Sequence, residues 1–188
     1  KLRASDGGEY DFFGSSVAIA GDSLIVGAYQ DDIGFRNDVG SAYVFTRNGS
    51  TWAQQQKLTT PDVFGVDGDW FGWSVAIEAD TAVVGAVRGD NGANSEQGNV
   101  YVFVRSGGVW TQQQKLLASD GASYDGLGDA VDISGNTVVA GANTDDNNAN
   151  QNQGATYVFV RSGSVWSQQQ RILAGDGQAF DIFGDSAA

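Results

Sequence analysis

The sequence of 188 residues contains no cysteine, no histidine, no methionine and one proline. The absence of cysteine excludes disulfide bonds and thiolate zinc sites, and the absence of histidine removes the usual base of a serine nucleophile. Lys and Arg number 10 against 23 Asp and Glu, which gives a formal net charge of −13 and argues against nucleic acid as a partner. No apolar run approaches the roughly 20 residues of a membrane-spanning helix, so we expect no membrane insertion.

A repeat of about 57 residues organises the whole sequence. The glutamine triplet that begins at Gln54 returns at Gln112 and Gln168, at intervals of 58 and 56 residues. A shared register over three copies is typical of a repeat protein, in which each copy is one structural unit. We divide the chain into repeat 1 (1–58), repeat 2 (59–116), repeat 3 (117–172) and the start of repeat 4 (173–188).

Each repeat is predicted to form four short strands. Apolar and small residues alternate in the first, the second is apolar on both faces, the third has a Tyr-Val-Phe core, and the fourth is rich in glutamine. Gly-Asp at 21–22 and Asn-Gly at 48–49 predict tight turns, and a polar loop of about twelve residues precedes the third strand. The expected strands are Phe13–Ala20, Leu24–Ala28, Ser41–Thr46 and Trp52–Leu58 in repeat 1, Phe71–Ile77, Ala82–Ala86, Asn99–Val104 and Trp110–Leu116 in repeat 2, and Leu127–Ile133, Thr137–Ala142, Ala155–Val160 and Trp166–Ile172 in repeat 3.

Four antiparallel strands per copy, repeated radially, predict an all-β fold: a β-propeller segment of four-stranded antiparallel blades, about three blades plus a partial fourth. A linear β-solenoid is the alternative, but its repeats are usually shorter and its strands parallel. The glutamine-rich fourth strand is expected to be a solvated outer edge. A propeller ring usually has four to eight blades, so we expect either further blades in a longer chain or self-association of copies end to end.

The Phe-Gly that opens the first strand and the Gly-Ala that closes the second resemble FG-GAP repeats, which form blades of the integrin α-subunit propeller and of many bacterial surface proteins. The Gln-Gln-Gln-Lys-Leu tract is similar to the bacterial branch. The resemblance implies an extracellular or cell-surface location. Integrin repeats carry a calcium loop between these two strands, where this sequence has only a tight turn, so those ligands do not carry over. The resemblance rests on Phe13, Gly14 and Gly27 in repeat 1, Phe71, Gly72 and Gly85 in repeat 2, and Leu127, Gly128 and Gly141 in repeat 3.

Most acidic residues fall in the connections expected at one end of the blades, and the long loops there are dense in oxygen ligands of the kind that calcium prefers. Turn formation by Asp and Asn side chains is the competing interpretation. None of the loops has the spaced Asp pattern with a closing Glu that is typical of a calcium loop. The candidate calcium ligands are Asp31, Asp32 and Asp38, then Asp90, Asn91 and Glu96, and then Asp145, Asp146 and Asn147.

The five tryptophans form two groups. Trp52, Trp110 and Trp166 recur in register, which favours structural packing between blades. Trp70 and Trp73 occur only in repeat 2, where they flank Phe71 next to a two-residue insertion in 61–70. They are the candidate ligand-binding residues, since such rings can stack on sugars.

Short motifs do not support catalysis. Gly21-Asp22-Ser23-Leu24 spells a serine-esterase signature without a histidine, and Arg88-Gly89-Asp90 spells an integrin-binding tripeptide that the other repeats lack. We predict no enzymatic activity and expect a secreted or cell-surface module for binding and scaffolding, in adhesion or assembly, with an unidentified protein or glycan ligand. A glycan-binding lectin is the alternative. A sialidase-like glycoside hydrolase ranks third, because it needs a Tyr nucleophile, a Glu base and an Arg cluster, and the sequence has three Glu and scattered Arg.

Overall fold

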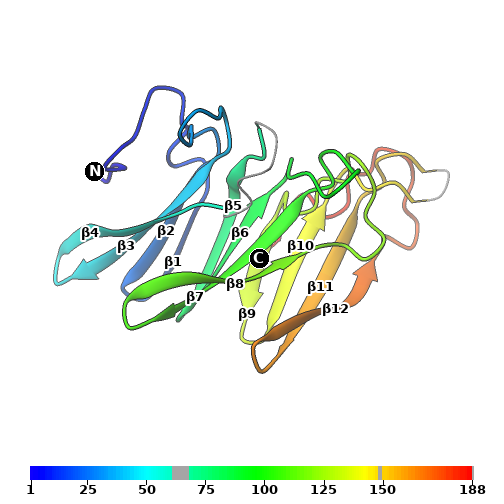
Figure 1. Ribbon diagram of the computed structural model, residues 1–188. Coiled ribbons are helices and arrows are strands. Elements are labelled where there is room, and N and C mark those ends of the chain that lie inside the picture. The colour runs from blue at the N-terminus through cyan, green and yellow to red at the C-terminus, as the bar shows by residue number, and fades with distance from the viewer. Residues whose placement is uncertain (61–67, 148–149, 188) are drawn as a thin grey trace.

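The computed structural model describes residues 1–60, 68–147 and 150–187. The strands of these residues form three antiparallel sheets of four, and each sheet keeps the order of its strands in the chain. We call the sheets blades 1, 2 and 3 (Figure 1). Blade 1 contains β1 (Val17–Ala20), β2 (Ser23–Ala28), β3 (Ser41–Asn48) and β4 (Thr51–Leu58); blade 2 contains β5 (Phe71–Glu78), β6 (Thr81–Ala86), β7 (Asn99–Ser106) and β8 (Val109–Leu116); blade 3 contains β9 (Val131–Ser134), β10 (Thr137–Ala142), β11 (Ala155–Ser162) and β12 (Val165–Ile172).

The blades lie side by side with their tight hairpins at one end and their long loops at the other (Figure 1). The loop end also holds the segments that lead into the first strands. Asn37 in the long loop of repeat 1 accepts a hydrogen bond from Gly68 N (3.0 Å), and Ser95 in repeat 2 accepts one from Tyr124 N (2.9 Å). The long loop of each blade is therefore tied to the segment before the next blade. No helix long and apolar enough to span a membrane occurs in the described ranges.

The predicted all-β architecture of propeller-type blades is confirmed, with changes at strand ends. β1 and β9 begin four residues later than predicted, in stretches where Gly14 (φ 99°) and Gly128 (φ 96°) leave the extended conformation. In blade 2 the register between β5 and β6 shifts between Phe71 and Ser74 instead. β3 continues to Asn48, so its hairpin has Gly49-Ser50 at the centre. The predicted two-residue insertion lies in 61–70, of which residues 61–67 are outside the described residues.

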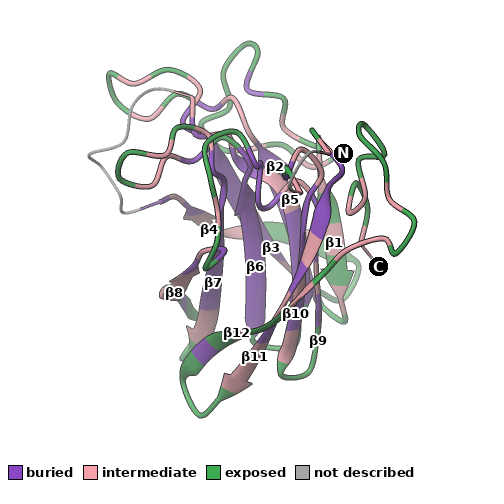
Figure 2. Ribbon diagram, turned by 90° about the vertical axis from the view of Figure 1, so that its right-hand side faces the viewer, coloured by how far each residue is buried: buried purple, intermediate pink, exposed green. Residues whose placement is uncertain are grey.

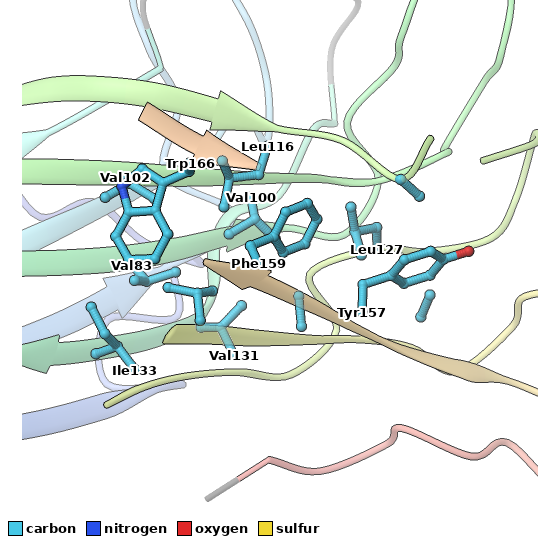
Figure 3. Close-up of a cluster of buried hydrophobic side chains, with 14 of the residues drawn as sticks. Val83, Val100, Val102, Leu116, Leu127, Val131, Ile133, Tyr157, Phe159 and Trp166 are labelled. Carbon is cyan, nitrogen blue, oxygen red and sulfur yellow. The ribbon is translucent and has the colours of Figure 1, made fainter. Parts of the chain in front are cut away.

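The core lies between the blades. Val100 and Val102 of β7 pack toward blade 3, whereas Tyr101 and Phe103 of the same strand pack toward blade 1. Figure 3 shows the cluster between blades 2 and 3, where Tyr157, Phe159 and Trp166 meet side chains of blade 2. Burial is greatest in the middle strands, and the loops and hairpin turns are exposed (Figure 2). The second and third strands of blade 2 are apolar on both faces because blades 1 and 3 cover that blade on its two sides.

The two glycine motifs meet across the contact between blades. A Cβ atom added to Gly27 would lie 2.0 Å from Gly72 O, and one added to Gly85 would lie 2.1 Å from Gly128 O. Ser74 Oγ donates to the same Gly128 carbonyl at 2.6 Å. The backbones of neighbouring blades thus approach so closely that only glycine fits on the second strand.

The glutamine-rich fourth strands are outer edges, as predicted, but their side chains are not simply solvated. The Gln114 side chain accepts a hydrogen bond from Trp166 N (2.8 Å) and donates one to Trp166 O (2.7 Å), while Gln113 accepts one from the Trp166 indole (2.8 Å). Gln56 and Trp110 repeat this arrangement between blades 1 and 2. The triplet therefore clamps each blade to the tryptophan of the next.

Candidate functional site

The candidate calcium ligands at the loop end mostly have partners within the chain. The carboxylate of Asp31 is buried and accepts hydrogen bonds from Ser41 Oγ (2.5 Å) and Tyr43 OH (2.8 Å), and Lys57 Nζ lies 2.7 Å away. Asp145 occupies the equivalent place in repeat 3, paired with Arg171 and with Tyr157 OH. Burial raises the pKa of Asp145, and the hydrogen bond from Tyr157 and the charge of Arg171 offset part of that effect.

Repeat 2 has no carboxylate at this buried position. Gly89 takes the position of Asp31, and the Asn99 side chain fills the space, since a Cβ on Gly89 would lie 2.0 Å from Asn99 Nδ2. Asn99 Nδ2 donates to Asp90 O at 3.4 Å. The Arg88-Gly89-Asp90 tripeptide is therefore not displayed as a free loop, because Gly89 is buried in it.

A second acidic residue in each long loop closes that loop. Asp32 Oδ1 accepts a hydrogen bond from Asp38 N (2.9 Å), Asp90 Oδ1 from Glu96 N (2.9 Å) and Asp146 Oδ1 from Asn152 N (2.8 Å). Asn91 and Asn147 donate to the buried Gln97 and Gln153 side chains. Among residues 1–60, 68–147 and 150–187, no three Asp or Glu side chains converge so as to hold a metal ion. The observed geometry is that of loop closure, and calcium binding stays a prediction.

Two further carboxyl groups at the loop end are buried with raised pKa values. Burial raises the pKa of Asp69 to about 6, and the negative charge of Asp90 adds to the shift. Burial likewise raises the pKa of Asp125 to about 6, although a backbone hydrogen bond from Ala122 N lowers that pKa in part. Asp69 and Asp125 are each 5% exposed. The loop end thus carries groups whose charge is costly near neutral pH.

The structure brings Trp70 and Trp73 together. Their rings stack with centroids 5.2 Å apart at an interplanar angle of 18°. The Tyr29 ring lies 5.1 Å from Trp70 and 4.9 Å from Trp73, edge to face with both. The Arg88 guanidinium lies 3.7 Å over Trp70, and the Trp73 indole donates to Asp129 Oδ1 at 3.0 Å. Aromatic residues of repeats 1 and 2 therefore form one cluster, to which Asp129 of repeat 3 is hydrogen-bonded.

A hollow of about 200 Å³ adjoins this cluster at the loop end, between blades 2 and 3. We call it the interblade hollow. A shallower hollow of about 300 Å³ runs along β5 and β9, and the two share Trp73 and Asp129. Arg88 is paired loosely with Glu96, at 3.7 Å. The interblade hollow is lined by Trp70, Trp73, Arg88, Tyr124, Asp129 and Asn143, among others.

Sequence reasoning missed the tyrosine of this hollow. Tyr10, Tyr124 and Phe180 occupy the same repeat position with φ of 71°, 72° and 68°, where repeat 2 has Gly68. An aromatic residue at positive φ is strained, yet these side chains are 75%, 63% and 64% exposed. Both blades that flank Tyr124 are present, so its exposure does not come from an absent neighbour. The recurrence of an aromatic residue three positions before the Phe-Gly motif was the available signal.

The serine-esterase signature has a structural role. Ser23 is 4% exposed, and its hydroxyl accepts a hydrogen bond from Arg105 Nη1 of blade 2 at 2.8 Å. Arg105 also pairs with Asp80 and lies 5.0 Å from the centroid of the Trp110 ring. Arg105 therefore joins blades 1 and 2.

Comparison with protein families gives three successive matches to the FG-GAP repeat, over residues 1–45, 52–103 and 110–159. These segments cover more than half of the chain. No curated protein matches the sequence.

Proposed function

The chain belongs to the FG-GAP repeat family, and from this premise we propose that it is a non-catalytic binding and scaffolding module that acts in adhesion or assembly outside the cell. One observation carries the proposal. The glycine and glutamine contacts recur at both junctions between blades, whereas the interblade hollow is built from Trp70 and Trp73, which no other repeat has. A repetitive scaffold with one distinctive hollow is suited to binding a ligand at that hollow.

The scaffolding part rests on the outward face of blade 1. Val17 and Ile19 are each 63% exposed there, while their equivalents Val75 (9%) and Ile77 (8%) lie in the core between blades 1 and 2. This face therefore carries the same apolar side chains that pack between blades 1 and 2. We propose that another blade covers it, either from a longer chain or from a second copy.

Glycan binding is the second candidate, and the exposed Tyr124 beside the stacked Trp70 and Trp73 favours it. Aromatic faces with nearby amide and hydroxyl groups can hold a sugar ring, and Asn143 and Thr144 supply such groups at the hollow.

Binding to arrays of extracellular proteins and of glycans tests the proposal. We expect a ligand that is lost when Tyr124 and Trp73 are replaced, as Tyr124→Gly and Trp73→Phe, and is kept in Phe35→Ala, which removes a fully exposed ring at a loop tip. Glycine suits the backbone at position 124, so that variant should fold. Ligand binding that survives both replacements would place recognition elsewhere and refute this assignment.

A further inference from the structure

We propose that the outward face of blade 3 binds a β-sheet that presents a lysine or arginine side chain to Asp132. Blade 2 covers one side of blade 3, and the outward face is the other side (Figure 1). The inference rests on the scaffolding part of the proposed function and names the chemistry of the partner. It concerns a surface apart from the interblade hollow, which other residues line.

Residues 183–187 already lie on this face, at the place where a further first strand begins. Phe183 N donates a hydrogen bond to Gln153 O at 2.9 Å. Phe71 N donates to Val39 O at the same distance where β5 joins blade 1. Blade 3 therefore receives the chain on its outward face as blade 1 receives the first strand of blade 2.

Most of the outward face has the residues of a junction between blades. Val139 and Val158 pair across β10 and β11 and are only half-buried. Their equivalents in blade 2, Val83 and Val102, are fully buried in the cluster between blades 2 and 3. Covering the two valines of blade 3 in the same way would remove their apolar surface from water, which is favourable.

Asp132 departs from this pattern. It alternates along β9 with Val131 and Ile133, which pack toward blade 2, so its side chain belongs to the outward face. Repeats 1 and 2 have Ala18 and Ala76 at this position, and both pack against the next blade. Within the described part of the chain, Asp132 forms no ion pair and no side-chain hydrogen bond.

A sheet that covers this face would take Asp132 out of water. A buried carboxylate without a partner is costly, whereas a lysine or arginine beside it forms a charge-assisted hydrogen bond. In the junction between blades 1 and 2, Ala18 packs against the cluster that contains Val75 and Ile77 of β5. Ala187 takes the position of Val75 in the repeat, so we place the basic residue at the position of Ile77.

A second copy of this chain fits the face poorly. Its blade 1 would present the exposed, apolar Val17 and Ile19 to Asp132. In addition, residues 3–16 of that copy and residues 173–187 of the first would need the same space, because both segments lead into a first strand. The charge of Asp132 thus selects against a copy and in favour of a basic partner.

The test completes a fourth blade on the chain. Ala188 has the repeat position of Ala76, so a copy of the sequence Ile77–Leu116 is added directly after it. The first added residue is Ile, Lys or Gln, and each extended chain is made with and without Asp132→Ala. With Asp132 present, Lys in place of Ile should raise the melting temperature by about 2–4 °C. With Asp132→Ala, the same Lys should lower it, which makes the pair a double-mutant cycle. Gln has no charge and should not reproduce the gain.

Four results would overturn the inference. An equal effect of Lys with and without Asp132→Ala shows that the two charges do not interact. Equal gains from Lys and Gln assign the site to a neutral hydrogen-bond donor. Amide exchange that leaves the added strands unprotected in all six chains shows that the face receives no sheet. A dimer of the unextended chain that Asp132→Lys abolishes in sedimentation assigns the face to a second copy. Because none of these measurements involves the interblade hollow, ligand binding there succeeds or fails independently.

Discussion

The contact between blades 1 and 2 and the contact between blades 2 and 3 share their glycine and glutamine interactions, whereas the loop ends above them differ. Gln56 holds Trp110 as Gln114 holds Trp166. At the loop end, the position of Trp73 is taken by a serine in repeat 1 and by Asp129 in repeat 3. The recurring residues form the framework. The residues that depart from the repeat lie at the loop end, where we place the binding site.

The largest expected effect breaks the repeated framework. Phe71 is fully buried and makes edge-to-face contacts with Tyr101 and Phe103. Phe71→Ala should lower the free energy of unfolding by about 3–5 kcal/mol, because it leaves a cavity between blades. Phe35→Ala should change stability little, since Phe35 is fully exposed. Denaturant unfolding of both variants measures the difference. Similar unfolding midpoints would show that Phe71 does not stabilise the contact between blades.

The glutamine clamp offers a smaller and sharper test. Gln114→Ala leaves the backbone N–H and C=O of the buried Trp166 without their partner, which should cost about 2 kcal/mol. Gln170 is the equivalent residue of repeat 3, is exposed, and makes no side-chain hydrogen bond within the described residues. Gln170→Ala should therefore be nearly neutral. Equal unfolding midpoints for these two variants would show that solvent replaces the clamp without cost.

The loop end should respond to pH in the direction opposite to a paired carboxylate. Burial raises the pKa of Asp125 to about 6 from an ordinary value of 3.8, so the folded state binds a proton more tightly than the unfolded state. Stability is then lost as pH rises from about 4 to about 6 and stays low above that range. Relative to Asp125→Asn, the unchanged protein should lose about 1–2 kcal/mol between pH 4 and pH 7.

Thermal unfolding of the two proteins across this range measures the effect, and Asp176→Asn serves as the control. A stability difference between the unchanged protein and Asp125→Asn that stays constant from pH 4 to pH 7 would contradict the assignment.

The smallest expected effect concerns calcium. Asp31 and Asp32 already have partners in the chain, so calcium in these loops would add a modest, ligand-specific stabilisation through mass action. We expect calcium to raise the melting temperature slightly beyond sodium chloride at equal ionic strength. Asp32→Asn should reduce that difference, and Asp22→Asn at the hairpin end should not. A response that sodium reproduces would leave only loop closure for these residues.

Much of the framework could be predicted from the sequence because period-2 patterns, tight turns and the register of the repeat all agree. The second and third strands lie where their apolar runs indicated. The first residues of β1 and β9 could not be placed, because the sequence does not show that Gly14 and Gly128 adopt a positive φ there. The glutamine-rich strands are edges as predicted, but the hydrogen bonds of Gln56 and Gln114 could not be predicted, because their partners belong to another blade.

The site could be predicted only in part. Trp70 and Trp73 stood out because they break the repeat, and the structure stacks them. Tyr124 and Asp129 come from repeat 3, and nothing in their own neighbourhood shows that they face Trp73 across the contact between blades. The acidic loops were recognised as dense in oxygen atoms, but composition alone could not show that those atoms bind the loops' own backbone.

The glutamine clamp also determines how a disturbance travels through the array. Each observed clamp spans one junction, from Gln56 to Trp110 and from Gln114 to Trp166, and the loop carbonyls likewise reach only the next repeat. The free energy of such an array approximates a sum of unit terms and nearest-neighbour terms, as in a one-dimensional chain of coupled elements. Amide exchange should therefore be slowest in blade 2, which has two coupled junctions, and a weakened junction should loosen its adjoining blades before distant ones.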